Sequence, residues 1–173
     1  FAVEAVAEID STNTELMRRA RAGRVEPVLL VAERQTAGRG RLGRPWQSAQ
    51  QGEEQGAASL TFSLGLPLAP RDWAGLSLAV GVSVAESLDP TGAAKVALKW
   101  PNDLWVEDRK LAGILIETAL PHAGGPAAQR YLVIGIGINI GAREADGMRT
   151  PPAWLHQWRP DATAPEVLRE LAE

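Results

Sequence analysis

The chain contains Gln35-Thr36-Ala37-Gly38-Arg39-Gly40-Arg41-Leu42-Gly43-Arg44-Pro45-Trp46, a glycine- and arginine-rich stretch that follows the apolar run Val28–Ala32. Its Gly38–Gly43 portion satisfies G-x-G-x-x-G after a predicted strand, the pattern of a dinucleotide-binding turn in a doubly wound α/β fold. In that fold the glycines open an apolar helix whose N-terminus binds pyrophosphate. Here Arg44-Pro45-Trp46 and then the polar segment Gln47–Gly56 follow instead. The sequence therefore argues against the dinucleotide-binding fold.

Positive charge is concentrated in this stretch, although the whole chain has a net charge of −3. No acidic residue lies between Glu33 and Glu53, a segment that holds four arginines, Arg34, Arg39, Arg41 and Arg44. Guanidinium groups repel by about 1 kcal/mol per pair at 4 Å in water, whereas charge-assisted hydrogen bonds to an anion contribute about 1.5–3 kcal/mol each. The stretch predicts a loop that is mobile when empty and orders over a bound phosphate. The alternative is an exposed basic turn without a role.

Length and composition exclude several classes of protein. The 173 residues are typical of one domain, and 45% hydrophobic with 23% charged residues indicates a globular chain. No apolar run approaches the roughly 20 residues of a membrane helix, and Phe1–Asp10 does not resemble a signal peptide. The absence of cysteine excludes disulfides and thiolate chemistry, and with only His122 and His156 any metal would be held by oxygen. We expect a soluble, cytoplasmic protein.

Apolar periodicity predicts that strands and helices are interspersed. Strands are expected at Val3–Ile9, Val28–Ala32, Ser59–Leu64, Lys95–Trp100, Leu104–Val106, Leu111–Thr118 and Arg130–Ile140. Helices are expected from Thr12 to about Ala22, over Trp73–Leu88 and from about Pro165. Thr12 and Glu15 have capping-box spacing at the first helix. The polar segment Gln47–Gly56 predicts a mobile loop.

A second group of polar residues surrounds a proline in Lys99-Trp100-Pro101-Asn102-Asp103-Leu104. The proline prevents regular ladder pairing, so the turn presents its side chains. Lys110 follows seven residues after Asp103, and the small residues Ala112-Gly113 would let a ligand approach the backbone. Lys110 is therefore a candidate site residue. The alternative is a solvated hairpin lysine paired with Asp108.

Isoleucine and glycine alternate in Ile134-Gly135-Ile136-Gly137-Ile138-Asn139. One face of this predicted strand is aliphatic, and the other has no side chain before Asn139. Either a ligand or a closely packed neighbouring element would lie against the bare face.

Four of these segments, Gln35–Trp46, Lys99–Leu104, Arg109–Leu115 and Gly135–Asn139, together resemble the motifs of the biotin protein ligases. The resemblance includes Asp10–Asn13 and extends from about Ile9 to Asn139. It implies an α+β fold with a mixed, mainly antiparallel sheet and helices packed on one face, as in class II synthetase-like catalytic domains. Residues 1–173 would form this catalytic domain. The DNA-binding N-terminal domain and the small C-terminal β-barrel of some relatives are expected to be absent.

The resemblance implies a reaction in two steps. The carboxylate of biotin attacks the α-phosphate of ATP to give biotinyl-5′-AMP and pyrophosphate. A lysine of a biotin carboxyl carrier domain, part of a biotin-dependent carboxylase, then attacks this anhydride. ATP and biotin are the expected substrates, with Mg²⁺ accompanying ATP. No nucleic acid and no membrane are expected as partners, and a homodimer is allowed.

Site residues follow from the resemblance position by position. The expected catalytic residues are Arg39, Arg41, Lys110 and Asp103. The expected biotin-binding residues are Ser11, Thr12, Asn13, Gln35, Gly38, Arg39, Gly40, Arg41, Lys110, Gly113, Gly135 and Gly137. The expected nucleotide-binding residues are Arg39, Arg41, Trp46, Asn102, Lys110, Asn139 and Trp154. No metal ligand is assigned.

Two other functions stay open. A lipoate ligase or octanoyltransferase has a related fold and also joins an acyl group to a protein lysine, but the arginine-rich loop favours biotin. A non-catalytic biotin-binding module would keep Ser11–Asn13 and Gln35 without needing Lys110 and Asp103. The long segment Gln47–Gly56 departs from the short Pro/Gly segment usual in the family.

Overall fold

The computed structural model describes residues 1–47, 58–70, 72–120, 129–143 and 150–172. The predicted loop Gln47–Gly56 lies, except for Gln47, outside the described residues. The chain forms two compact units. The first unit consists of Phe1–Ser48, Thr61–Ala74 and Leu115–Ile136, and the second of Ala49–Leu60, Gly75–Ile114 and Gly137–Glu173.

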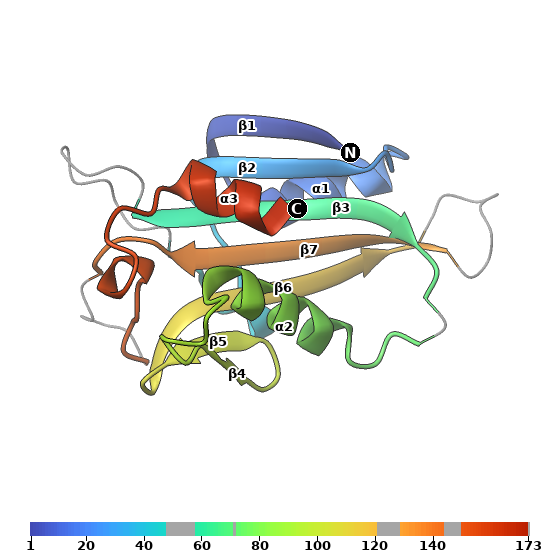
Figure 1. Cartoon of the computed structure of the whole chain (residues 1–173). Coiled ribbons are helices and arrows are strands. Elements are labelled where there is room, and N and C mark those ends of the chain that lie inside the picture. Colours follow the sequence, from blue (N-terminus) through green and yellow to red (C-terminus); the bar gives the residue numbers. More distant parts are fainter. Residues whose placement is uncertain (48–57, 71, 121–128, 144–149, 173) are drawn as a thin grey trace. The chain divides into compact units, whose positions relative to one another are not determined.

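Within the described residues, seven strands form one sheet in the order β1-β2-β3-β7-β6-β5-β4 (Figure 1). Strands β1 and β2 are parallel, whereas the pairs β2 with β3, β4 with β5 and β5 with β6 are antiparallel. The strands span Ala2–Ile9 (β1), Val28–Gln35 (β2), Ser59–Leu68 (β3), Ala97–Lys99 (β4), Asp103–Val106 (β5), Arg109–Ala119 (β6) and Arg130–Asn139 (β7). The predicted α+β class with a mixed, mainly antiparallel sheet is confirmed.

Helix α1, Thr12–Arg21, connects the parallel strands β1 and β2. The side chain of Ser11 caps it by accepting the Thr14 N–H at 3.4 Å, one residue before Thr12, which has capping-box spacing to Glu15. The N–H and the hydroxyl of Thr12 are instead both donated to Gln35 Oε1. The helix ends before Gly23, whose φ of +82° suits a glycine.

The core of the first unit lies between α1 and the sheet. It is formed by side chains spaced along one face of the helix and by inward-facing residues of β2 and β7. Its buried members are Leu16, Met17, Ala20, Val28, Leu30, Tyr131 and Val133. Burying a leucine or valine side chain contributes roughly 1.5–3 kcal/mol, so this cluster fixes α1 against the first half of β2 and against β7.

Helix α2, Leu76–Leu88, packs on β4 and β6 within the second unit. It begins later than the predicted Trp73 because Gly75, at the N-cap, has a left-handed φ of +78°. Gly81 faces β4, where an added Cβ would stand 2.2 Å from Leu98 Cδ1. Ser77 Oγ donates to the Pro101 carbonyl at 3.0 Å. Helix α2 therefore supports both β4 and the turn that precedes β5.

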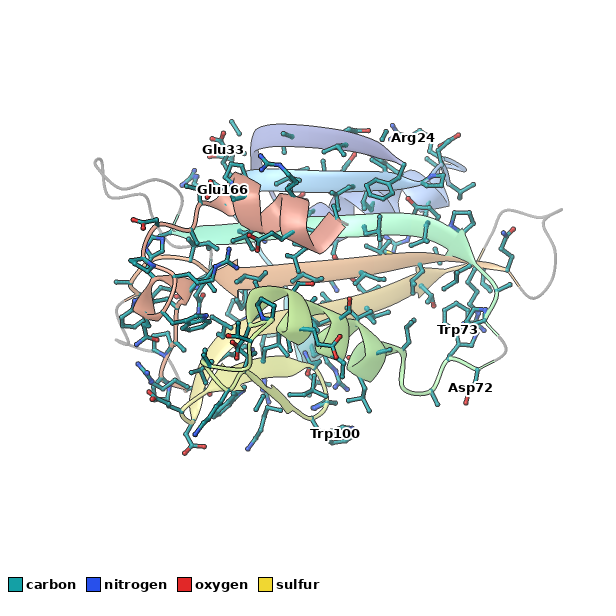
Figure 2. All side chains as sticks on the ribbon, viewed as in Figure 1. Arg24, Glu33, Asp72, Trp73, Trp100 and Glu166 are labelled. Atoms are coloured by element: carbon teal, nitrogen blue, oxygen red, sulfur yellow. The ribbon has the colours of Figure 1, made fainter. Side chains whose placement is uncertain are left out.

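The strand predicted at Lys95–Trp100 is shorter in the structure, because Lys95 has a φ of +55° and only Ala97–Lys99 pairs with β5. Trp100 follows in the turn and is 76% exposed, and Figure 2 shows its ring away from the ribbon.

Helix α3, Ala164–Ala172, begins close to the predicted Pro165. Thr163 and Glu166 form a capping box at its start. The Glu166 carboxylate accepts the Thr163 N–H at 3.0 Å and the Thr163 hydroxyl at 2.8 Å, and the Thr163 hydroxyl oxygen accepts the Glu166 N–H. These hydrogen bonds lower the pKa of Glu166. In the part of the chain that the structure describes, every helix is too short or too polar to cross a bilayer.

Candidate functional site

A buried polar cluster lies where α1 begins, in the first unit. Ile9, the last residue of β1, is in register with Gln35, the last of β2. The residues that follow Ile9 therefore meet the Gln35 side chain, whose Oε1 accepts the Thr12 N–H at 2.8 Å and the Thr12 hydroxyl at 3.1 Å. Ser11, Thr12 and Asn13 are all buried. The structure thus brings together four of the residues expected to bind biotin, Ser11, Thr12, Asn13 and Gln35.

Ser63, on β3, belongs to the same cluster and was missed by the sequence analysis. Its hydroxyl is fully buried, lies 2.7 Å from Thr12 Oγ1 and donates to Asn13 Oδ1 at 2.6 Å. The strand carries small hydroxyl residues on one face and apolar side chains on the other. This alternation could have indicated a polar face: Ser59, Thr61 and Ser63 against Leu60, Phe62 and Leu64.

Glu117, on β6, completes the cluster and was also missed. Asn13 Nδ2 donates to Glu117 Oε2 at 3.1 Å and to the Leu115 carbonyl at 3.2 Å. Arg39 Nη2 donates to Glu117 Oε1 at 3.1 Å. The sequence pattern that could have identified it is a single carboxylate within the apolar run Leu111–Thr118.

The glycine-arginine stretch forms a tight hairpin. The Gly40 N–H donates to the Arg44 carbonyl at 2.7 Å, and the Trp46 N–H donates to the Gly38 carbonyl at 2.8 Å. At its tip the residues Arg41–Gly43 form a short 3-10 turn. Gly38 is required because an added Cβ would stand 2.4 Å from the Trp46 carbonyl oxygen. Arg39 and Arg41 are exposed.

Carboxylates from other strands face two of the four arginines between Glu33 and Glu53. Arg39 pairs with Glu117, and Arg34 Nε donates to the Glu8 carboxylate at 2.7 Å. Strands distant in sequence therefore supply carboxylates to two of the four arginines, and the predicted binding of a phosphate stays a prediction. The predicted mobility of the loop stays a prediction.

Lys110 and Asp103 form an ion pair in the second unit, with Lys110 Nζ 2.9 Å from Asp103 Oδ1. The side chains are 29% and 24% exposed. Asp108, the alternative partner, instead lies in the β5–β6 turn with a φ of +58°. Lys110 therefore lies beside the other residue expected to be catalytic.

A β-bulge brings this pair to one face of the sheet. Asp103 is in register with Gly113, but the register shifts after Leu104, so that Lys110 lies opposite Trp105. Side chains opposite each other on paired strands share a face, as do side chains two residues apart. Lys110 therefore shares the face of Trp105 and Asp103. Without the shift, the alternation of side chains would place Lys110 on the opposite face.

Asn139 holds the backbone around Lys110. Its Nδ2 donates to the Lys110 carbonyl at 3.1 Å and to the Ala153 carbonyl at 2.9 Å, and its Oδ1 accepts from Arg143 Nη1 at 2.6 Å. Asn139 is buried, and burial also lowers the pKa of Arg143. Both amide hydrogens of Asn139 are thus donated within the chain. Its predicted contact with adenine stays a prediction.

The other predicted residues lie in both units. Asn102 Nδ2 donates to the Ile114 carbonyl at 2.7 Å, which ties the turn before β5 to β6. Trp154 is half-buried just before the 3-10 turn Leu155–Gln157, and Gly137 is buried on β7. Gly135 lies in the first unit, where an added Cβ would stand 2.0 Å from Asn13 Oδ1. At Gly135, close packing of a neighbouring element therefore accounts for the bare strand face.

No ready-made cluster of metal ligands is found in the described part of the chain. The described residues contain no group of three or more histidine, aspartate or glutamate side chains arranged to hold one. Asp103, paired with Lys110, is the carboxylate among the expected catalytic residues.

Comparison with known proteins places the chain in a family. A model described as the biotin/lipoate A/B protein ligase family matches residues 5–139. The biotin–[acetyl-CoA-carboxylase] ligase of Mycobacterium tuberculosis is 37% identical over 180 residues, covering 98% of this chain and 62% of that protein. The bifunctional ligase/repressor BirA of Escherichia coli is 43% identical over 150 residues, covering 85% of this chain and 43% of that protein.

A solved structure supports the same assignment. The biotin protein ligase of Aquifex aeolicus, in complex with biotin and ATP, has a TM-score of 0.73 at 31% identity and covers 98% of this chain and 66% of that one. The chain therefore spans less than two thirds of the length of these three relatives. The match over residues 5–139 establishes that the chain belongs to the biotin/lipoate A/B protein ligase family.

Proposed function

We propose that this chain is the catalytic domain of an ATP-dependent ligase that adenylates biotin and transfers it to a protein lysine. The names of the relatives support the proposal, as does the complex of the Aquifex aeolicus enzyme with biotin and ATP. The acceptor we propose is a biotin carboxyl carrier domain of a biotin-dependent carboxylase. A cytoplasmic location and a homodimer stay predictions.

The buried cluster of the first unit is suited to the biotin ring. A ureido group carries two N–H donors and a carbonyl acceptor, so it needs partners of both kinds. Thr12, Gln35 and Ser63 offer hydroxyl and amide groups whose mutual hydrogen bonds fix their orientation before ligand arrives. Such preorganisation lowers the entropy lost on binding.

In the first step, a biotin carboxylate oxygen bonds to the α-phosphorus of ATP while the bond from that phosphorus to the bridging oxygen of pyrophosphate breaks. Two anions meet in this step, so cations must neutralise the charge that concentrates in the transition state. We assign this role to Arg39, Arg41 and Lys110. We expect Mg²⁺ to be held mainly by the phosphate oxygens of ATP, because Mg²⁺ favours oxygen ligands and retains several waters.

In the second step, the neutral amine of the acceptor lysine attacks the carbonyl carbon of the anhydride. An amide bond forms, AMP leaves with the electron pair of the broken bond, and the amine loses a proton. Asp103 lies beside Lys110, and its carboxylate can orient the incoming amine or accept a hydrogen bond from it.

The observation that carries the proposal is the half-buried Lys110–Asp103 pair. A module that only bound biotin would not need a cation and a carboxylate held together in this way. The experiment is exchange of labelled pyrophosphate into ATP. Exchange should require biotin and fall about 100-fold in Lys110→Ala and Arg39→Ala, the size of effect expected when a group that stabilises transition-state charge is removed.

The same assay distinguishes the alternatives. Exchange driven by lipoate or octanoate instead of biotin would assign the chain to the lipoate branch of the family. Biotin binding without any exchange in the intact protein would assign it to a non-catalytic module.

A further inference from the structure

We propose that Glu117 is a positioning residue that fixes Arg39 and Asn13 for the binding of biotin. The inference rests on the proposed function, and it concerns a residue that the motifs of the chain do not include. Glu117 is the point where the hairpin, the start of α1 and strand β6 meet, through its bonds to Arg39 and Asn13.

The two contacts require a carboxylate. Oε1 accepts from Arg39 Nη2 and Oε2 from Asn13 Nδ2, each at 3.1 Å. Both partners can only donate through these nitrogens, so each oxygen must be an acceptor. A glutamine at this position has one acceptor oxygen and one NH₂ group, and the NH₂ group would face a second donor. Glutamine therefore keeps the shape of Glu117 but loses one of its two contacts.

The orientation of Asn13 depends on this arrangement. Its Oδ1 accepts from Ser63, and its Nδ2 donates to Glu117 and to the Leu115 carbonyl. Ser63 in turn contacts Thr12, whose hydroxyl bonds Gln35. Glu117 therefore lies at the end of a hydrogen-bond chain that runs through the residues proposed to hold the biotin ring.

Stability alone does not account for the pair. The Arg39 and Glu117 side chains are 44% and 22% exposed, and ion pairs with this degree of exposure contribute little to the free energy of unfolding. Its effect is instead to hold the hairpin arginine against β6, next to the start of α1. Loss of the pair should therefore weaken biotin binding more than it weakens the fold.

The test is a double-mutant cycle between Glu117→Gln and Arg39→Ala, measured as KM for biotin in pyrophosphate exchange. Glu117→Gln alone should raise KM about tenfold, the effect of one lost charge-assisted hydrogen bond. In the Arg39→Ala background the same change should alter KM less than about twofold, because the glutamine oxygen can then face Asn13 without opposing a second donor. Glu107→Gln, at an exposed ion pair with Arg109, is the matched control and should behave as the parent chain.

Equal effects of Glu117→Gln in both backgrounds, or an unchanged KM in the single variant, would overturn the inference. If the single variant does not fold, the double variant can still be compared with Arg39→Ala, because the glutamine NH₂ group then no longer faces the Arg39 guanidinium.

A second readout does not depend on catalysis. In the unliganded protein, the Asn13 side-chain amide protons should exchange with solvent faster in Glu117→Gln than in Glu107→Gln. A parent chain without biotin-dependent exchange would contradict the proposed function, whereas unchanged amide exchange would contradict the role of Glu117.

Discussion

Lys110 lies on the same face of the sheet as Asp103 because a β-bulge after Leu104 shifts the pairing of β5 and β6. The ion pair therefore depends on the register of two strands, and it holds the ammonium group of Lys110. The backbone of Lys110 is held separately, by the 150–153 segment and by Asn139. Bulges are enriched next to active sites because they redirect one side chain without disturbing the rest of the strand.

Replacing Asp103 by asparagine should lower kcat of the full biotinylation reaction about tenfold and change KM for biotin less than twofold. The amide retains the size of Asp103 but loses the charge that holds Lys110 in place. The measurement is steady-state biotin transfer to a carrier domain. Asp108→Asn is the matched control, since asparagine tolerates the positive φ of the turn. Equal effects of the two variants would refute a specific role for the Lys110–Asp103 pair.

Gly135→Ala should destabilise the chain by about 2 kcal/mol or more, because the new Cβ would stand 2.0 Å from Asn13 Oδ1 in a buried cluster. Gly141→Ala is the comparison, with its nearest atom at 3.6 Å and no positive φ. Chemical denaturation measures both. Similar free energies of unfolding for the two variants would show that Asn13 can move aside without loss.

Asn139→Ala should lower the free energy of unfolding by about 1–3 kcal/mol, because it removes the side-chain donor of the Ala153 carbonyl in a buried hydrogen bond, whereas the Lys110 carbonyl keeps the Ala153 N–H. KM for ATP should rise in the same variant, since the Lys110 segment loses its support. A rise in KM with an unchanged free energy of unfolding would mean that Asn139 acts only through the nucleotide.

Stability at alkaline pH should depend on Tyr131. Burial raises the pKa of its phenol, whose hydroxyl donates to the Glu26 carbonyl at 3.3 Å. The folded state thus holds the proton more tightly than the unfolded state, whose phenol has a pKa of about 10. The stability that depends on this proton is present below pH 10 and is lost as the pH rises through the higher pKa of the folded state.

Tyr131→Phe should therefore reduce the loss of stability above pH 10 and cost about 1 kcal/mol at neutral pH. Thermal unfolding between pH 7 and 11 measures both effects, with the parent chain as reference. A parallel decline of the two proteins with pH would assign the alkaline sensitivity to other groups.

Local patterns were sufficient for much of the fold. The helix over Thr12–Arg21, the hairpin of β5 and β6 and the strand over Arg130–Asn139 follow from periodicity and turn residues, and the structure confirms them. The convergence of Ser11–Asn13 on Gln35 could also be anticipated, because it needs only two strands joined by one helix.

Contacts that depend on register could not be predicted. Ser63 and Glu117 come from strands β3 and β6, and their meeting with Asn13 depends on the order of strands in the sheet. The same limit applies to the partners of the arginines. The sequence analysis counted only the charges near the arginines in the chain. Strand pairing also brings the carboxylates of Glu8 and Glu117 near Arg34 and Arg39.

Helix α2 has no residue among those proposed to touch substrate, yet it supports the strand and turn from which Asp103 extends. Gly81 accommodates Leu98 of β4, and Ser77 holds the Pro101 carbonyl. A larger side chain at position 81 would push β4 outward, and β5 pairs directly with β4. A genetic screen for inactive enzyme should therefore recover substitutions on the inner surface of this helix, and proximity to the ligand would be a poor criterion for interpreting them.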